Sequence, residues 1–220
     1  MHLILANAEK TTQVIISLNE GARISSLIVG GKTIIKELPD FSYSDSYAAA
    51  ILFPFASRIE KGAYQFDGKT YQLDCNQAGI NALHGLVYNK TFTVINQKVT
   101  DSTAAVTMVY TETNPPKGFP FQYALEVTYT LSENNVGIAI KVTNLDTTPF
   151  PFTLGWHPYF YTEHLAESVV KFNSHQQVAF DEKLITKELV LFTNEGDFAI
   201  ENKQIDDCFV INDAIIEFET

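Results

Sequence analysis

Residues 123–142 read YALEVTYTLSENNVGIAIKV, and this stretch sets the expected fold class. Apolar and polar side chains alternate from Tyr123 to Leu131 and again from Val136 to Val142, a period of two that is typical of strands with one buried face. The intervening residues 132–135 are predicted to form a turn, because asparagine tolerates a left-handed backbone. The stretch therefore predicts two antiparallel strands of a meander.

Segments with an alternating or continuous apolar pattern recur and extend the β prediction over the chain. They lie at residues 12–18, 24–29, 63–66, 70–73, 92–99, 104–111, 150–154, 168–172, 189–192, 198–201, 208–211 and 214–218. Asp67-Gly68 stands between two of them, at the spacing of a two-residue hairpin with positive φ at both central residues. Alanines favour a helical segment at residues 44–52, which Pro54 would terminate.

Composition and organisation favour one large β domain over residues 1–220. Hydrophobic residues make up 45% of the chain and aromatic residues 12%, which is enough for a core and excludes global disorder. We find no linker, charge block or short repeat that would mark a boundary. So many strands in one domain predict an all-β fold of two large antiparallel sheets packed face to face, with loops at the edges forming a site.

Charge and hydropathy exclude several classes of partner. The formal net charge of −11 repels a phosphate backbone, so nucleic acid is not expected as a ligand. The longest apolar run, residues 48–56, is broken by Pro54 and falls short of the roughly 20 residues that span a membrane. The first residues lack the features of a secretion signal. We therefore expect a cytoplasmic protein in which Cys75 and Cys208 are buried thiols and not a disulfide.

Two histidines stand in sequence contexts that suit chemistry. His84 precedes a glycine that permits close approach to the backbone. His157 is held extended by the proline after it, and Trp156 and Tyr159 on either side could wall a sugar-sized pocket. The alternative for each imidazole is a core group hydrogen-bonded to a carbonyl. The remaining histidines are predicted to be solvated surface groups: His2, His164 and His175.

One arginine and one acidic pair are further candidates. Arg58 follows the apolar residues 53–57; composition favours a structural ion pair, and donation to a ligand's hydroxyls is the alternative. Asp206-Asp207 precedes a predicted strand, where it is either a polar turn or a carboxylate source for sugar hydroxyls. Nucleotide-loop, zinc-protease, serine-hydrolase and calcium-loop motifs are absent from the sequence. Since no third ligand stands at zinc spacing, we expect no metal and no cofactor.

Taken in order, five segments resemble the aldose 1-epimerase family, also called galactose mutarotases. They are residues 53–69 (FPFASRIEKGAYQFDGK), 81–85 (NALHG), 118–131 (GFPFQYALEVTYTL), 155–160 (GWHPYF) and 205–209 (IDDCF). Each segment is short, but together they cover nearly the whole chain in the order of the family. The resemblance implies a large twisted antiparallel β-sandwich, the galactose mutarotase-like supersandwich, that acts on a hexose.

The resemblance also implies roles for single residues. His157 would be the general acid that protonates the ring oxygen of the sugar, while His84 and Arg58 would hold nearby oxygens. Asp206, rather than Asp207, aligns with the sugar-binding aspartate of the family. Opening a cyclic hemiacetal needs a proton on the ring oxygen and removal of one from the C1 hydroxyl, each worth roughly 10² to 10⁴ in rate. Reclosure on the other face gives the opposite anomer without a redox cofactor.

Two features depart from the family pattern. Ser57 stands where the family usually has asparagine, which weakens the orientation of the neighbouring arginine. The family's catalytic glutamate lies well beyond the acidic segment, whereas this sequence ends at Thr220, so no catalytic base is assignable. Glu217 and Glu219 read as the polar face of an edge strand. We therefore expect a C-terminally incomplete member that has little activity or completes its sheet as a homodimer through an exposed edge.

The leading hypothesis is an aldose 1-epimerase that interconverts the α and β anomers of a hexose by general acid–base ring opening. The alternative from another class is a catalytically weak or silent carbohydrate-binding β-sandwich, which needs the same aromatic cleft but no proton donor or acceptor. The third hypothesis is a structural or regulatory protein that keeps only the fold. Replacing His157 separates the first two, because an enzyme loses turnover while a binding module loses mainly affinity.

Overall fold

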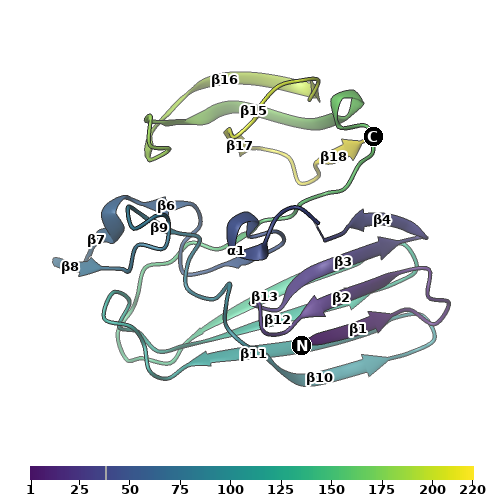
Figure 1. Ribbon diagram of the computed structural model, residues 1–220, viewed down its shortest axis with the longest axis horizontal. Coiled ribbons are helices and arrows are strands. Elements are labelled where there is room, and N and C mark those ends of the chain that lie inside the picture. Colours follow the sequence, from purple (N-terminus) through teal and green to yellow (C-terminus); the bar gives the residue numbers. More distant parts are fainter. Residues whose placement is uncertain (38) are drawn as a thin grey trace. The chain divides into compact units, whose positions relative to one another are not determined.

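Antiparallel strands make up nearly all of the regular structure of this chain (Figure 1). The computed structural model describes residues 1–37 and 39–220, and the all-β prediction is confirmed. Backbone contacts divide the chain into two units, Met1–Tyr161 and Thr162–Thr220, which are described separately. That residues 1–220 act as one domain stays a prediction.

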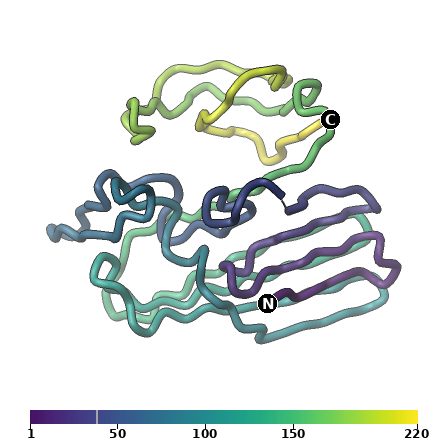
Figure 2. Tube along the Cα trace, viewed as in Figure 1, coloured from purple at the N-terminus to yellow at the C-terminus, as the bar shows by residue number. Residues whose placement is uncertain are grey.

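Two four-stranded sheets form the body of the first unit. One has the order β1-β2-β3-β4 and the other the order β10-β11-β12-β13, with neighbours antiparallel (Figure 2). Their strands are β1 (His2–Ala6), β2 (Gln13–Ser17), β3 (Arg23–Val29), β4 (Lys32–Ile35), β10 (Thr93–Val99), β11 (Ala104–Glu112), β12 (Tyr123–Leu131) and β13 (Val136–Asn144).

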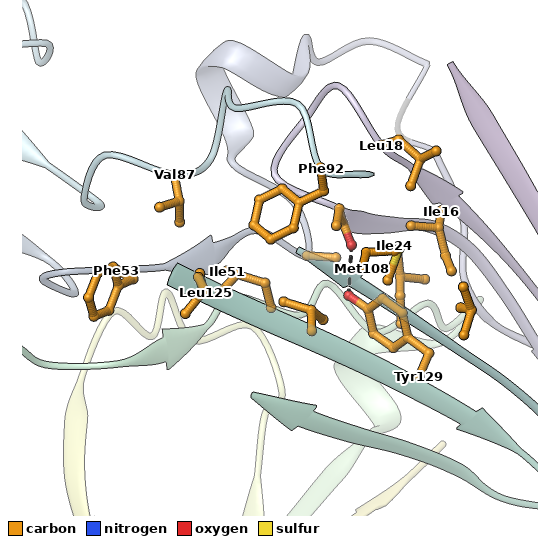
Figure 3. Close-up of a cluster of buried hydrophobic side chains, with 14 of the residues drawn as sticks. Ile16, Leu18, Ile24, Ile51, Phe53, Val87, Phe92, Met108, Leu125 and Tyr129 are labelled. Atoms are coloured by element: carbon orange, nitrogen blue, oxygen red, sulfur yellow. Dashed lines mark hydrogen bonds between the residues drawn. The ribbon is translucent and has the colours of Figure 1, made fainter. Parts of the chain in front are cut away.

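The core of the first unit lies between these two sheets. Every second residue of β12, from Tyr123 to Leu131, is buried, as the alternating pattern predicts. These side chains share one apolar cluster with Val14, Ile16 and Ile24 of the first sheet (Figure 3). The prediction of two antiparallel sheets packed face to face is therefore confirmed for this unit.

Short strand pairs and turns complete the first unit. The predicted Asp67-Gly68 hairpin is confirmed: the two residues have φ values of 48° and 70°, and Phe66 pairs with Lys69. These elements are β5 (Ile51–Leu52) with β14 (Gly155–Trp156), β6 (Arg58–Ile59) with β9 (Ala82–Leu83), β7 (Ala63–Phe66) with β8 (Lys69–Gln72), and the 3₁₀ turn η1 (Glu60–Gly62).

The helix expected at residues 44–52 is largely wrong. Helix α1 covers only Tyr43–Ser46, and the chain leaves it at Tyr47, whose φ of 50° is left-handed. Ala49 N–H then donates to His157 O at 2.7 Å, and His157 N–H donates to Ala50 O at 3.0 Å. Pairing with a distant segment thus overrides the helix propensity of the alanines, and residues 51–52 become β5.

Three smaller expectations also need correction. Residues 150–154 form no strand, and Thr153 N–H instead donates to Pro54 O at 2.8 Å. The turn after β12 is present, but its asparagines, Asn134 and Asn135, do not have positive φ. The two cysteines are unbridged as expected, yet Cys75 is half-buried and Cys208 is exposed, so neither is a buried thiol.

The second unit is one small antiparallel sheet of order β16-β15-β17, with β18 also paired to β15. Strand β16 merges two predicted segments, 189–192 and 198–201, into one long strand. The elements are η2 (Leu165–Glu167), β15 (Val169–Phe180), β16 (Thr186–Ala199), β17 (Cys208–Ile211) and β18 (Glu217–Glu219). Glu217 and Glu219 are exposed on either side of half-buried Phe218, as expected for a polar strand face. Self-association through a sheet edge stays a prediction.

His2, His164 and His175 are exposed, as predicted. In residues 1–37 and 39–220, no helix has the length and apolar character needed to cross a bilayer.

We expect Tyr129→Phe to lower the free energy of unfolding by about 1–3 kcal/mol. The Tyr129 hydroxyl donates to the carbonyl of buried Ala22 at 2.8 Å, and the change leaves that carbonyl without this donor in the core (Figure 3). Urea unfolding measures the change. Lys141→Met, which removes an exposed ion pair to Glu126, is the control and should cost at most about 0.5 kcal/mol. Equal losses of unfolding free energy for the two substitutions would refute a stabilising role of the Tyr129–Ala22 hydrogen bond.

Candidate active site

His84 and His157 lie together in the structure although they are 73 positions apart in the sequence. Their ring centroids are 4.9 Å apart and the ring planes are inclined by 44°. Both side chains are half-buried. The fold of the first unit thus brings the two histidine motifs singled out in the sequence to one place.

The β5–β14 pair positions His157. Gly155 and Trp156 pair with Leu52 and Ile51, and the reciprocal bonds of His157 with residues 49–50 continue this ladder by one more step. Figure 3 shows Ile51 in the buried cluster, so the strand that aligns His157 is itself fixed in the core. Trp156, the preceding residue, packs against that core, as expected where neighbouring side chains of an extended segment alternate between faces.

The β6–β9 pair positions His84 and Arg58. Arg58 is paired with Leu83, and His84 N–H donates to Ser57 O at 3.0 Å. His84 has a φ of 62°, a left-handed conformation that is uncommon outside glycine and persists where the surroundings enforce it.

Gly85 explains why a glycine follows His84. It has a φ of 79°, and a Cβ at this position would lie 2.3 Å from the carbonyl oxygen of Phe53. The next residue, Leu86, donates its N–H to that same oxygen at 2.7 Å. Any side chain at position 85 would therefore push the His84 loop away from β5 and the segment after it.

A backbone carbonyl defines the tautomer of His157. His157 Nδ1 lies 3.1 Å from Tyr47 O. Since a carbonyl oxygen can only accept, Nδ1 carries the hydrogen, and the chemistry of the ring falls to Nε2. Within the described residues of the first unit, no hydrogen bond occupies Nε2. The core-histidine alternative and the functional one are therefore compatible, because each uses a different ring nitrogen.

His84 is neutral near pH 7. Burial, followed by the positive charges of His157 and Arg58, lowers the pKa of His84 from 6.5 to about 4. Its Nδ1 is buried without a hydrogen-bond partner in the described chain. A neutral imidazole with one uncommitted nitrogen can accept or donate a hydrogen bond to a ligand.

The other predicted site residues are placed as follows. Arg58 is half-buried and forms no ion pair within the described part of the first unit, so the structural ion pair favoured on composition is wrong there. Tyr159 is 38% exposed, with its ring centroid 5.4 Å from that of His157. Asp206 is exposed in the segment before β17, in the second unit, and its role in sugar binding stays a prediction.

Sequence reasoning missed three residues of this site. Tyr47 packs edge-on against His84, with ring centroids 5.0 Å apart, and Tyr88 packs in the same way on Tyr47 at 4.9 Å. Asn76 Nδ2 lies 3.3 Å from each tyrosine hydroxyl. Tyr47 was missed because it lies in the segment, residues 44–52, that was predicted to be helical. One indication of Asn76 was available in the sequence, namely that it is a polar residue shortly before the NALHG segment.

The side chains of this site do not form a cluster of metal ligands. Across residues 1–37 and 39–220, no group of three or more histidine, cysteine, aspartate or glutamate side chains is placed to hold a metal ion. The site instead combines imidazoles, a guanidinium and aromatic rings, which suit hydrogen bonding to a neutral polyhydroxy ligand.

Comparison with known proteins identifies relatives over most of the chain. The chain is 27% identical over 208 residues to the maltose epimerase of Levilactobacillus brevis, covering 88% of this chain and 60% of that protein. It is 29% identical over 138 residues to the galactose mutarotase of Sus scrofa, covering 63% of this chain and 38% of that protein. The match therefore spans less than two thirds of either relative.

A solved structure and a family model agree with these relatives. The aldose epimerase homologue of C. elegans superposes with a TM-score of 0.78 at 18% identity, covering 100% of this chain and 75% of that one, which shows a shared fold. The model of the aldose 1-epimerase family matches residues 2–219. The chain belongs to the aldose 1-epimerase family, and its fold is galactose mutarotase-like.

Proposed function

We propose that this chain is an aldose 1-epimerase that interconverts the α and β anomers of a hexose by general acid–base ring opening. The observation that carries the proposal is the pair of imidazoles, 4.9 Å apart, built on the two strand pairs that also present Arg58. Family membership supports a carbohydrate epimerase in general. The names of the relatives, which refer to maltose and galactose, favour a hexose or a hexose-containing sugar as substrate.

His157 is the proposed acid. Protonated at both nitrogens, it keeps the Nδ1 bond to Tyr47 O and donates the Nε2 proton to the ring oxygen of the sugar. The bond between C1 and the ring oxygen then breaks, and the C1 hydroxyl loses its proton to a base as the aldehyde forms. After rotation about C1–C2, the hydroxyl formed from the ring oxygen adds back to the other face of the carbonyl and returns its proton to Nε2, while the carbonyl oxygen takes back the proton held by the base and becomes the C1 hydroxyl of the opposite anomer.

Neutral His84 and the Arg58 guanidinium complete the proposed site. The low pKa of His84 keeps this ring neutral near pH 7, so it adds no positive charge 4.9 Å from the ring of His157. Both His84 and Arg58 can then hydrogen-bond sugar oxygens whose charge changes during ring opening. Trp156 and Tyr159 remain the proposed additional sugar contacts of the first unit, and sugar binding by Asp206 stays a prediction.

A catalytically weak or silent sugar-binding protein is the second candidate. The observation that favours it is the absence, within the described residues of the first unit, of a carboxylate hydrogen-bonded or ion-paired to His84, His157 or Arg58. Without a base, the site could hold a hexose and still open the ring slowly. Turnover and binding therefore have to be measured separately.

We expect the chain to accelerate the mutarotation of freshly dissolved α-glucose or α-galactose, and His157→Asn to reduce this rate by roughly 10²- to 10⁴-fold. Polarimetry follows the rate, and ligand-observed NMR follows sugar binding. His164→Asn, at an exposed histidine, is the matched control and should retain the wild-type rate. Sugar binding with no acceleration by the wild type would support the silent alternative, and a fully active His157→Asn variant would refute the proposed acid.

We also expect stability to fall on acidification because of His84. The unfolded chain binds this proton near pH 6.5 but the folded chain only near pH 4. Stability is thus fully present above pH 6.5 and is lost as the pH falls towards 4, by roughly 1–3 kcal/mol, with solvent screening favouring the lower end.

The variant His84→Asn removes this titration while tolerating the left-handed backbone. Urea unfolding at pH 7 and pH 4.5 should therefore show a smaller acid-induced loss for His84→Asn than for the wild type. His175→Asn, at an exposed position, is the control. The same loss in all three proteins would contradict the low pKa of His84.

A further inference from the structure

We propose that Asn76 is a positioning residue of this site, which fixes His84 and His157 relative to each other through Leu83 and Tyr47. The proposal rests on the proposed epimerase function for its kinetic consequence, but its structural basis is independent of the reaction. Asn76 is exposed and contacts neither imidazole through any hydrogen bond described for this unit.

The first contact holds the backbone before His84. Asn76 Nδ2 donates to Leu83 O at 2.9 Å, and Leu83 N–H donates to Asn76 Oδ1 at 2.7 Å. The amide thus pairs with Leu83 as a neighbouring strand would, and the two bonds together fix which end of the amide is nitrogen. On its other edge, this segment bonds to Ser57 through His84 N–H. The left-handed His84 is therefore held from both edges.

The second contact reaches the tyrosine on which both imidazoles depend. Asn76 Nδ2 lies 3.3 Å from the hydroxyl oxygens of Tyr47 and Tyr88. The ring of Tyr47 packs edge-on against His84, and the carbonyl of Tyr47 accepts from His157 Nδ1 at 3.1 Å. Moving Tyr47 would therefore disturb both imidazoles at once, one through its ring and the other through its backbone.

Neighbouring asparagines do not provide this link. Asn81 is nearer to His84 in sequence, but its side chain accepts from Lys61 N–H at 3.0 Å and donates to Gln77, so it holds the turn before β9. Asn144 makes a comparable pair of backbone bonds, to Thr148 O and from Asp146 N–H, in the loop after β13. Asn144→Ala is thus a matched control that removes an exposed, backbone-bridging asparagine elsewhere.

The test combines steady-state mutarotation kinetics with NMR titration of the two imidazoles in the full chain. We expect Asn76→Ala to lower kcat by about 10- to 100-fold, since small misplacements of catalytic groups cost this much, while KM changes far less. The signals of both His84 and His157 should shift, and the His84 titration should move up from about pH 4 towards 6.5 as water enters. Asn144→Ala should leave kcat and both signals unchanged.

A second variant keeps the proposal testable if Asn76→Ala does not fold. Asn76→Asp keeps an acceptor for Leu83 N–H but removes the donors to Leu83 O and to the tyrosines, and its charge should raise the His84 titration further. Wild-type imidazole signals in either folded Asn76 variant, or an unchanged kcat, would overturn the proposal. If the wild type shows no mutarotation, the proposed function fails, and the imidazole signals alone still decide the role of Asn76.

Discussion

The close approach between Gly85 and the carbonyl of Phe53 is the constraint on which the site depends. Phe53 follows β5, the strand that aligns His157, and Gly85 follows His84. Leu86 N–H bonds to the same carbonyl at 2.7 Å, and the Phe53 side chain is buried against Tyr123 of β12. One backbone contact therefore joins the strand pair that carries His157 to the strand pair that carries His84, and anchors both in the core.

This arrangement also explains how two similar side chains acquire different properties. His157 is tied at Nδ1 to a carbonyl, which settles its tautomer and leaves Nε2 for chemistry. His84 Nδ1 is buried without a hydrogen-bond partner among residues 1–37 and 39–220, and burial, followed by the charge effects of His157 and Arg58, lowers the pKa of His84. Environment, rather than residue type, thus separates the proposed proton donor from a neutral hydrogen-bonding group. His157 affects the pKa of His84 only while the two rings are close, and the contact between Gly85 and the Phe53 carbonyl holds the two segments together.

Local sequence patterns predicted the parts of the fold that depend on local physics. The alternation in residues 123–131 and the Asp67-Gly68 turn were sufficient for β12 and for the β7–β8 hairpin, since each reports burial or backbone conformation directly. The helix at 44–52 was wrong because bonds to His157 decide that segment. Asn76 and Tyr47 were missed for the same reason: their roles come from partners distant in sequence, and no period or spacing encodes such contacts.

The proximity of the two histidines was an expectation from the order of several motifs and not from either motif alone. His157 next to Trp156 and His84 next to Gly85 were each compatible with an ordinary core imidazole. The structure shows that His157 does bond to a carbonyl, as that reading required, and that no hydrogen bond from the described residues of the first unit occupies its other ring nitrogen. For Arg58, composition favoured an ion pair that is absent from the described part of the first unit, because composition carries no information on which acids are near.

The positions of Phe53 and Gly85 also limit how such a site can diversify. A side chain at position 85 would displace the His84 loop from the segment that aligns His157, so the framework leaves little freedom for stepwise adaptation to a new ligand. Tyr159, in contrast, stands beside His157 with an exposed ring and no role in that framework. If the chain acts as proposed, new preferences among sugars would therefore arise at Tyr159, at the rim of the site, while the proposed chemistry of the two imidazoles is retained.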